Sequence, residues 1–335
     1  MKKLNKSTKI IIAVALIIVI CIPCGFLIAR WTSNKKADIV VTMFSQYDWT
    51  KQVLGSNPAG LRVKYLMDNG VDPHSYEPSI QDTAEIIQSR LFIYVGEAET
   101  NVRRILRNNP NSSRRELALM NVVGGEIYKH ENQDHDCDAD CDHEHTGDEH
   151  IWLSLRFAQR FVAAIANEIA RLDSKNGDYY MANAQKYNEK LVTLDTEYEQ
   201  VFNKALEGNP IKPLLFADRF PFIYLLQDYD YGIRDTHWIA AFTYCGAVPE
   251  NISPTMINNL RQAITNHSLS YVFILENSTF RPTAESIAAS SGRNPTVLVL
   301  NSIQSVTRGE VKNSTYIGIM TQNLENIKKA LEVTI

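Results

Sequence analysis

Histidine, cysteine and acidic side chains are concentrated between His130 and His150. Five of the eight histidines fall in this stretch, together with two of the five cysteines. Imidazole, thiolate and carboxylate groups are the ligands of borderline divalent ions, zinc above all. Residues 130–147 hold almost nothing apolar, so we expect a loop that captures metal, the alternative being a merely solvated acidic loop. Its candidate ligands are His130, His135, Cys137, Cys141, His143 and His145, the two cysteines either pairing with each other or binding as thiolates.

A second candidate ligand, His74, lies in the segment Val-Asp-Pro-His-Ser-Tyr-Glu-Pro, residues 71–78. Pro73 and Pro78 restrict the backbone of this segment, so the histidine is held at little further cost in conformational entropy. The segment follows an expected strand at 61–67, and open α/β sheets bind ligands at the carboxyl ends of their strands. We therefore expect His74 to bind metal, although a single loop histidine does not define a site.

Three further residues complete a candidate site. His150 closes the acidic stretch shortly before an expected long helix, where the backbone is fixed. Asp218 and Glu276 directly follow expected strands at 213–217 and 271–275. Two imidazoles from one lobe and two carboxylates from the other would form a four-ligand site in the cleft between lobes. The alternative is that either acid forms a salt bridge, with Arg219 or Arg281 as the candidate partner.

The remaining histidines and the last cysteine fit structural roles. His237 lies beside Trp238 near an expected strand, and His267 lies in a polar turn that we expect to face water. Cys245 is more typical of a small buried hydrophobic residue than of a ligand.

The composition is that of a globular protein with two α/β lobes. The chain has 335 residues, of which 44% are hydrophobic and 21% charged. The net charge is −4 and there is no basic stripe, which argues against a nucleic-acid partner. No nucleotide-binding glycine loop occurs, and no nucleophile with its base is recognisable, so we do not expect an enzyme.

The N-terminus predicts a membrane anchor. Four lysines precede an uncharged run at residues 10–29, whose roughly 20 residues at ~1.5 Å each can cross a ~30 Å hydrocarbon layer. The lysines should remain in the cytoplasm, which places everything after Arg30 outside. Cys21 or Cys24 could instead carry a lipid, but both have poor lipoprotein cleavage contexts, so we favour an uncleaved anchor.

Strands and helices alternate on both sides of two long helices. Expected strands are 39–44, 61–67, 91–95, 213–217, 271–275 and 296–301. Expected helices are 47–54, 79–89, 255–265, 283–291 and 322–332, and the two long ones follow Ser154 as N-cap and span 179–206. The pattern predicts an α/β fold with two lobes, each a mainly parallel sheet flanked by helices.

The predicted division of the chain follows this pattern. Residues 1–36 are the anchor and a tether, 37–153 the N-terminal lobe with the histidine-rich loop, 154–178 a linking helix and 179–335 the C-terminal lobe.

From about Ile39 onward the chain resembles the zinc and manganese solute-binding proteins of bacterial ABC importers, the ZnuA-like and adhesin-type lipoproteins. Residues 71–78 are similar to the first-ligand motif of that family, and 148–152 (Asp-Glu-His-Ile-Trp) to its second. Residues 218–222 (Asp-Arg-Phe-Pro-Phe) resemble a variant branch. The resemblance implies two lobes joined by one rigid helix, with a metal site between them formed by His74, His150, Asp218 and Glu276.

Two departures from the family pattern bear on the metal. Most zinc members have a third histidine where this chain has Ala217, Asp218 and Arg219, and many have an acid soon after the position of Glu276. A site with two histidines and two carboxylates is rich in oxygen, which shifts weight from Zn²⁺ toward Mn²⁺ or Fe²⁺.

The function implied is that of an extracytoplasmic receptor, anchored on the outer face of the cell membrane and monomeric. It would capture a divalent ion, zinc as first choice, and deliver it to an ABC permease with its ATPase. Binding should release protons from histidine, so affinity should fall below about pH 6. The alternatives are a metal-scavenging or adhesin surface protein, and a zinc hydrolase with Glu77 as its only obvious base and no His-Glu-x-x-His helix.

Overall fold

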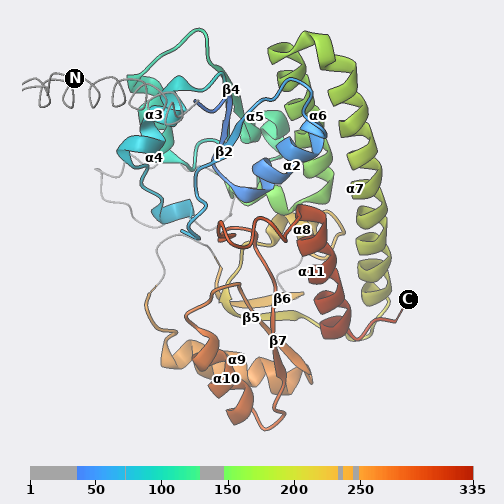
Figure 1. The fold of residues 1–335 in the computed structure, drawn as a ribbon. Coiled ribbons are helices and arrows are strands. Elements are labelled where there is room, and N and C mark those ends of the chain that lie inside the picture. Colours follow the sequence, from blue (N-terminus) through green and yellow to red (C-terminus); the bar gives the residue numbers. More distant parts are fainter. Residues whose placement is uncertain (1–35, 72, 129–146, 233–236, 244–248, 335) are drawn as a thin grey trace, which may run out of the picture. The chain divides into compact units, whose positions relative to one another are not determined.

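The computed structural model describes residues 36–71, 73–128, 147–232, 237–243 and 249–334 (Figure 1). Ala37–Ile335 form one compact unit by their internal contacts. The predicted anchor at 10–29, the candidate ligands of the loop 130–146 and Cys245 lie outside the described residues. Among the residues that the structure describes, no helix is long and apolar enough to cross a membrane.

The first lobe is built on a four-stranded parallel sheet with the order β2-β1-β3-β4. Its central strand β1 is buried along its whole length, as its Ile-Val-Val sequence predicts. The strands are β1 (Ile39–Val41), β2 (Val63–Tyr65), β3 (Leu91–Tyr94) and β4 (Arg115–Ala118). The helices are α2 (Phe44–Leu54), α3 (Ile80–Gln88), α4 (Thr100–Asn108) and α5 (Leu119–Val123).

The second lobe repeats the arrangement, with the order β6-β5-β7-β8 and all four strands parallel. The parallel direction places the carboxyl ends of β5 and β7 side by side. The strands are β5 (Leu214–Arg219), β6 (Trp238–Phe242), β7 (Tyr271–Ile274) and β8 (Thr296–Val299). The helices are α8 (Ile223–Gln227), α9 (Pro254–Asn266), α10 (Arg281–Ser290) and α11 (Tyr316–Leu331).

Two antiparallel helices, α6 (Leu155–Leu172) and α7 (Gly177–Leu206), pack against each other, and α7 runs along both lobes (Figure 1). On the first lobe, the Asn183 side chain of α7 donates to the carbonyl of Val53 over 3.0 Å. On the second, the Tyr198 hydroxyl donates to the carbonyl of Met320 over 2.7 Å. One helix thus contacts both lobes, and the predicted fold with two parallel sheets and a long central helix is confirmed.

The predicted start of α6 is also confirmed, because the Ser154 hydroxyl accepts a hydrogen bond from the N–H of Phe157. The spacing of Ile80, Ala84, Ile86 and Ile87 in the sequence predicts that they face the core, and for Ile80 this prediction is wrong. Ile80 is 92% exposed at the first position of α3, and Ile86 is the residue of that helix that is fully buried. This nine-residue helix buries one narrow face, and Ile80 at its first position lies outside that face.

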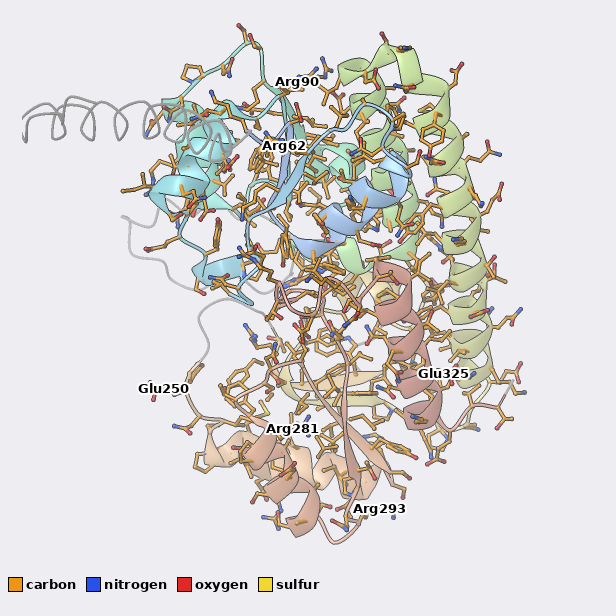
Figure 2. All side chains as sticks on the ribbon, in the orientation of Figure 1. Arg62, Arg90, Glu250, Arg281, Arg293 and Glu325 are labelled. Carbon is orange, nitrogen blue, oxygen red and sulfur yellow. The ribbon has the colours of Figure 1, made fainter. Side chains whose placement is uncertain are left out.

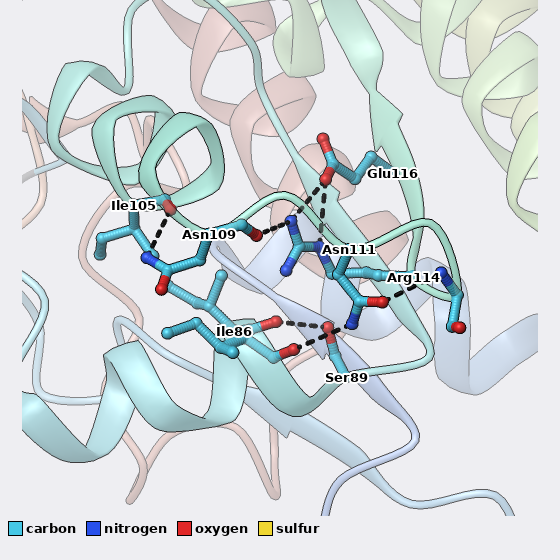
Figure 3. A network of polar contacts seen from close by, with 9 residues as sticks. Ile86, Ser89, Ile105, Asn109, Asn111, Arg114 and Glu116 are labelled. Atoms are coloured by element: carbon cyan, nitrogen blue, oxygen red, sulfur yellow. Dashed lines mark hydrogen bonds and ion pairs between the residues drawn. The ribbon is translucent and has the colours of Figure 1, made fainter.

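Strand β4 was not predicted, because its sequence Arg-Glu-Leu-Ala is polar. A hydrogen-bonded network fixes the loop before it (Figure 3). The buried guanidinium of Arg114 donates to Glu116 Oε1 over 2.7 and 3.1 Å and to the carbonyl of Asn109 over 3.2 Å. Asn111 caps the same loop by donating to the carbonyl of Ile87 over 3.4 Å. Tertiary contacts, rather than local hydrophobicity, therefore determine this edge strand.

Candidate metal site

His150 is held in place at the start of the long helix pair. It precedes the turn Ile151–Leu153, which leads into α6, and its side chain is 3% exposed. The ring nitrogen Nδ1 lies 2.9 Å from Asp148 Oδ1, which also accepts the backbone N–H of His150 over 2.9 Å. A carboxylate on one ring nitrogen is the usual means of orienting a metal-binding histidine. A neutral ring that donates from Nδ1 presents Nε2 as its lone-pair nitrogen.

The segment that carries His74 lies next to this turn. The backbone of His74 is part of the 3₁₀ turn Pro73–Ser75, while its side chain falls outside the described part of the structure. A narrow cavity joins the two segments, because Pro73 lines it together with Glu149 and Trp152. The backbones of the two predicted first-lobe ligands are therefore neighbours.

A buried acid that was not predicted, Glu99, lines the same cavity. Burial raises the pKa of its carboxyl to about 7, although the backbone N–H groups of Val95 and Gly96 donate to it. The nearby charge of Glu149 acts in the same direction. Glu99 lies five residues after the end of β3 and Glu97 precedes it, so the rule that an acid directly after a strand is a candidate ligand would have selected Glu97 instead.

In the second lobe, Asp218 lies at the end of β5 and is 1% exposed. Its Oδ2 accepts the backbone N–H of Leu275 over 3.0 Å, and its Oδ1 accepts that of Arg219 over 2.8 Å. The carboxylate therefore joins the carboxyl ends of β5 and β7. Each carboxylate oxygen has two lone pairs, so these bonds leave room for a metal.

Glu276 lies two residues after the end of β7 and is partly buried. Its Oε2 accepts the N–H of Ser302 over 2.6 Å, and its Oε1 accepts the Ser302 hydroxyl over 2.8 Å and the N–H of Gln304 over 3.1 Å. Burial raises the pKa of Glu276, and these hydrogen bonds oppose the rise. Arg281, a candidate salt-bridge partner, instead lies 3.7 Å from Glu285 on the outer helical layer (Figure 2).

A contact between the lobes connects the two halves of the candidate site. The indole of Trp152 donates to the carbonyl of Ser302 over 2.8 Å, and its ring lies 5.2 Å from that of His150. His150 is thus linked to Glu276 through two intervening residues. No three histidine, cysteine, aspartate or glutamate side chains form a metal-binding group among those that the structure describes. The four-ligand set therefore remains a prediction.

The other predicted residues are found in structural surroundings. The buried ring of His237 lies 3.2 Å from the carbonyl of Tyr231, and His267 is exposed at the end of α9.

Two parallel four-stranded sheets supported by one long helix are the architecture of a metal solute-binding protein. The family model described as zinc-uptake complex component A, periplasmic, matches residues 39–330. The chain belongs to this family.

Individual relatives agree with the family model. The zinc-binding lipoprotein AdcA of Streptococcus pneumoniae is 27% identical over 320 residues, which cover 92% of this chain and 59% of AdcA. The chain thus spans little more than half the length of that relative. The high-affinity zinc uptake system protein ZnuA of Bacillus subtilis is 27% identical over 319 residues, covering 92% of this chain and 93% of ZnuA.

Solved structures show the same fold. The Zn(II)-bound ZnuA-like domain of Streptococcus pneumoniae AdcA has a TM-score of 0.69 at 24% identity, covering 89% of this chain and 100% of the domain. The periplasmic zinc-binding protein TroA of Treponema pallidum has a TM-score of 0.71 at 19% identity, covering 88% and 99%.

Proposed function

We propose that this protein is an extracytoplasmic receptor that captures Zn²⁺ between its lobes and delivers it to an ABC permease with its ATPase. The observation that carries the proposal is the link from His150 to Glu276 across the lobes, in a chain matched over 39–330 by a zinc-uptake family. The names of the AdcA and ZnuA relatives, a zinc-binding lipoprotein and a zinc uptake protein, support zinc as cargo.

The proposed ligands are His74, His150, Asp218 and Glu276. His150 is oriented by Asp148, as a metal-binding histidine requires. Asp218 and Glu276 are at the carboxyl ends of adjacent strands, where α/β sheets bind ligands. Both carboxylates are already fixed by backbone N–H groups, so little conformational entropy is lost when they bind a metal.

Manganese or iron is the alternative cargo. One observation favours it: Asp218 and Arg219 stand where most zinc members have a third histidine, so the site is rich in oxygen. The metal retained on purification in the experiment below decides between these ions.

The proposed location is the outer face of the cell membrane, with residues 10–29 as the anchor or as a lipoprotein leader. The loop 130–147 would raise the local concentration of zinc, with His130, His135, Cys137, Cys141, His143 and His145 as weak ligands. A permease and an ATPase encoded beside this protein would support delivery. Their absence would favour a scavenging or adhesive surface protein.

The experiment that tests the site is metal analysis of the full-length chain, purified in detergent without a histidine tag. We expect about one tightly bound zinc in the unaltered protein and its loss in His74→Ala, His150→Ala, Asp218→Ala and Glu276→Ala. His267→Ala is the matched control, because that ring is exposed at the end of α9. Tight zinc that survived all four substitutions would show that the ligands lie elsewhere.

A further inference from the structure

The turn that holds Glu276 contains a strained residue. Ile303 has φ +63° and is completely buried. The other non-glycine residues with positive φ in the described part of the chain are asparagine, aspartate, serine and glutamate, which are not branched at Cβ. A β-branched residue in the left-handed region is an outlier that costs free energy and persists only where its surroundings impose it.

One side of this turn contacts the carboxylate of Glu276. The N–H groups of Ser302 and Gln304, on either side of Ile303, donate to Oε2 over 2.6 Å and to Oε1 over 3.1 Å. Alternate amides converge on one anion when the backbone between them turns left-handed. The strained conformation of Ile303 therefore directs two N–H groups at Glu276, and the Ser302 hydroxyl adds a third donor.

The other side of the turn faces the first lobe. The carbonyl of Ser302, which is 1% exposed, accepts the indole N–H of Trp152 over 2.8 Å. Trp152 is 1% exposed, its carbonyl accepts the Tyr316 hydroxyl over 2.8 Å, and its ring contacts that of His150. Ser302 thus binds a carboxylate of the second lobe and a tryptophan of the first lobe.

We propose that Ser302 and Trp152 are positioning residues that set the distance between Glu276 and His150 and so determine how slowly the metal is released. The inference rests on the proposed function and deepens it. The turn fixes the carboxylate oxygens of Glu276, and Trp152 connects the turn to the first lobe. Glu276 and His150 can then move apart only when the hydrogen bond from Trp152 to Ser302 breaks. Loss of either contact should loosen the site while leaving its ligands in place.

The test is the rate at which the full-length, zinc-loaded protein releases zinc to an excess of a chromogenic chelator. Trp152→Phe removes the indole donor, and Ser302→Ala removes one donor to Glu276. Each should accelerate release about fivefold to tenfold, the effect of one net hydrogen bond. The double variant should release zinc no faster than the faster single variant, since both changes act on one turn.

Trp238→Phe is the matched control. Trp238 is a tryptophan of the second lobe that is less buried than Trp152, and its ring, at the amino end of β6, stacks on that of Phe220 at 3.8 Å. The Trp238→Phe variant should release zinc at the same rate as the unaltered protein. Zinc should change the tryptophan emission of the unaltered protein and of Trp238→Phe, and should change it much less in Trp152→Phe.

The outcomes separate the two proposals. Folded variants that release zinc at the unaltered rate would overturn the positioning role and leave the receptor function standing. Additive acceleration in the double variant would also overturn it, because general destabilisation adds whereas one shared contact does not. If Ser302→Ala does not fold, Trp152→Phe alone decides. An unaltered protein that retains no zinc would refute the receptor function, and the positioning role with it.

Discussion

The carboxylate of Asp48 on α2 accepts a hydrogen bond from the backbone N–H of Tyr316, the first residue of α11, over 3.0 Å. The same oxygen accepts the Tyr187 hydroxyl of α7 over 3.1 Å. One buried oxygen therefore joins the first lobe to the second lobe and to the supporting helix. A negative charge at the start of α11 also interacts favourably with the helix dipole. Burial raises the pKa of Asp48, so the charge is held there at a cost.

Asp48→Ala should lower the free energy of unfolding by about 2–4 kcal/mol, because it leaves the N–H of Tyr316 and the hydroxyl of Tyr187 without an acceptor. Asp48→Asn keeps an acceptor oxygen and avoids burying a charge, so its effect should be less than half as large. Urea unfolding of both variants at pH 7 measures the difference. Equal losses would show that the charge, rather than the acceptor, stabilises the contact.

Asp228 should make the protein less stable as the pH rises from about 4 to 6. Its Oδ2 accepts the hydroxyl of Ser154, the N-cap of α6, over 2.7 Å. Burial raises its pKa from 3.8 to about 6. The native state therefore holds this proton more tightly than the unfolded chain, so the contribution is present below pH 4 and is lost as the pH passes 6. The free energy of unfolding should fall by roughly 2–3 kcal/mol, since each unit of pKa shift corresponds to ~1.36 kcal/mol.

Asp228→Asn removes this titration, and its free energy of unfolding should vary less between pH 4 and 7 than that of the unaltered protein. The control is Asp230→Asn, an exposed residue on the same segment whose positive φ asparagine also tolerates. Unfolding by urea at several pH values gives both curves. The explanation fails if the Asp228→Asn curve keeps the unaltered slope.

Arg114 should stabilise the edge of the first sheet. Its side chain is fully buried and pairs with Glu116, whose side chain is 37% exposed (Figure 3). Arg114→Ala leaves the carbonyl of Asn109 and a partly buried carboxylate without their donor, and should cost about 2 kcal/mol. Arg107→Ala, an exposed residue of α4, should change stability by less than about 0.5 kcal/mol. Similar melting temperatures for the two variants would refute the role of the network.

Local sequence signals predicted much of the fold. Ser154 marked the start of α6, and the apolar spacing of α7, with Tyr187, Leu191 and Tyr198, matched its buried face. Strand β4 was not predicted because Arg115 and Glu116 make it polar. The loop that precedes it is fixed by tertiary contacts, which no local pattern encodes. The prediction for Ile80 was wrong because the spacing of apolar residues indicates which face of a helix is buried, but not how far along the helix the burial extends.

The candidate site was predictable only in part. Asp218 and Glu276 follow strands, and the strand rule places them at one edge of the sheet, as the structure does. The contact of Trp152 with Ser302 joins residues 150 positions apart and depends on how the lobes pack, which the sequence pattern does not specify. The left-handed conformation of Ile303 runs against its residue type, so no propensity argument could reveal it.

Deleting residues 131–146 should leave the tight metal site intact. The segments on either side are already joined, since the N–H of Asp148 donates to the carbonyl of Tyr128 over 2.8 Å and the Tyr224 hydroxyl bonds to both residues. After the deletion, three residues separate Tyr128 from Asp148, and the same hydrogen bond then closes a single helical-type turn. Gly147 must be kept, because an added Cβ would lie 2.6 Å from the carbonyl oxygen of Tyr128.

The deletion variant should retain about one tightly bound zinc and lose the weakly bound ions. The deletion removes every candidate loop ligand except His130, whereas His74 and His150 stay. Equilibrium dialysis followed by mass spectrometry counts both classes. The matched control keeps the length of the loop and replaces its histidines and cysteines with serine, which separates ligand loss from chain shortening. If tight zinc disappears from both variants, the loop itself is the main site and the assignment to the cleft is wrong.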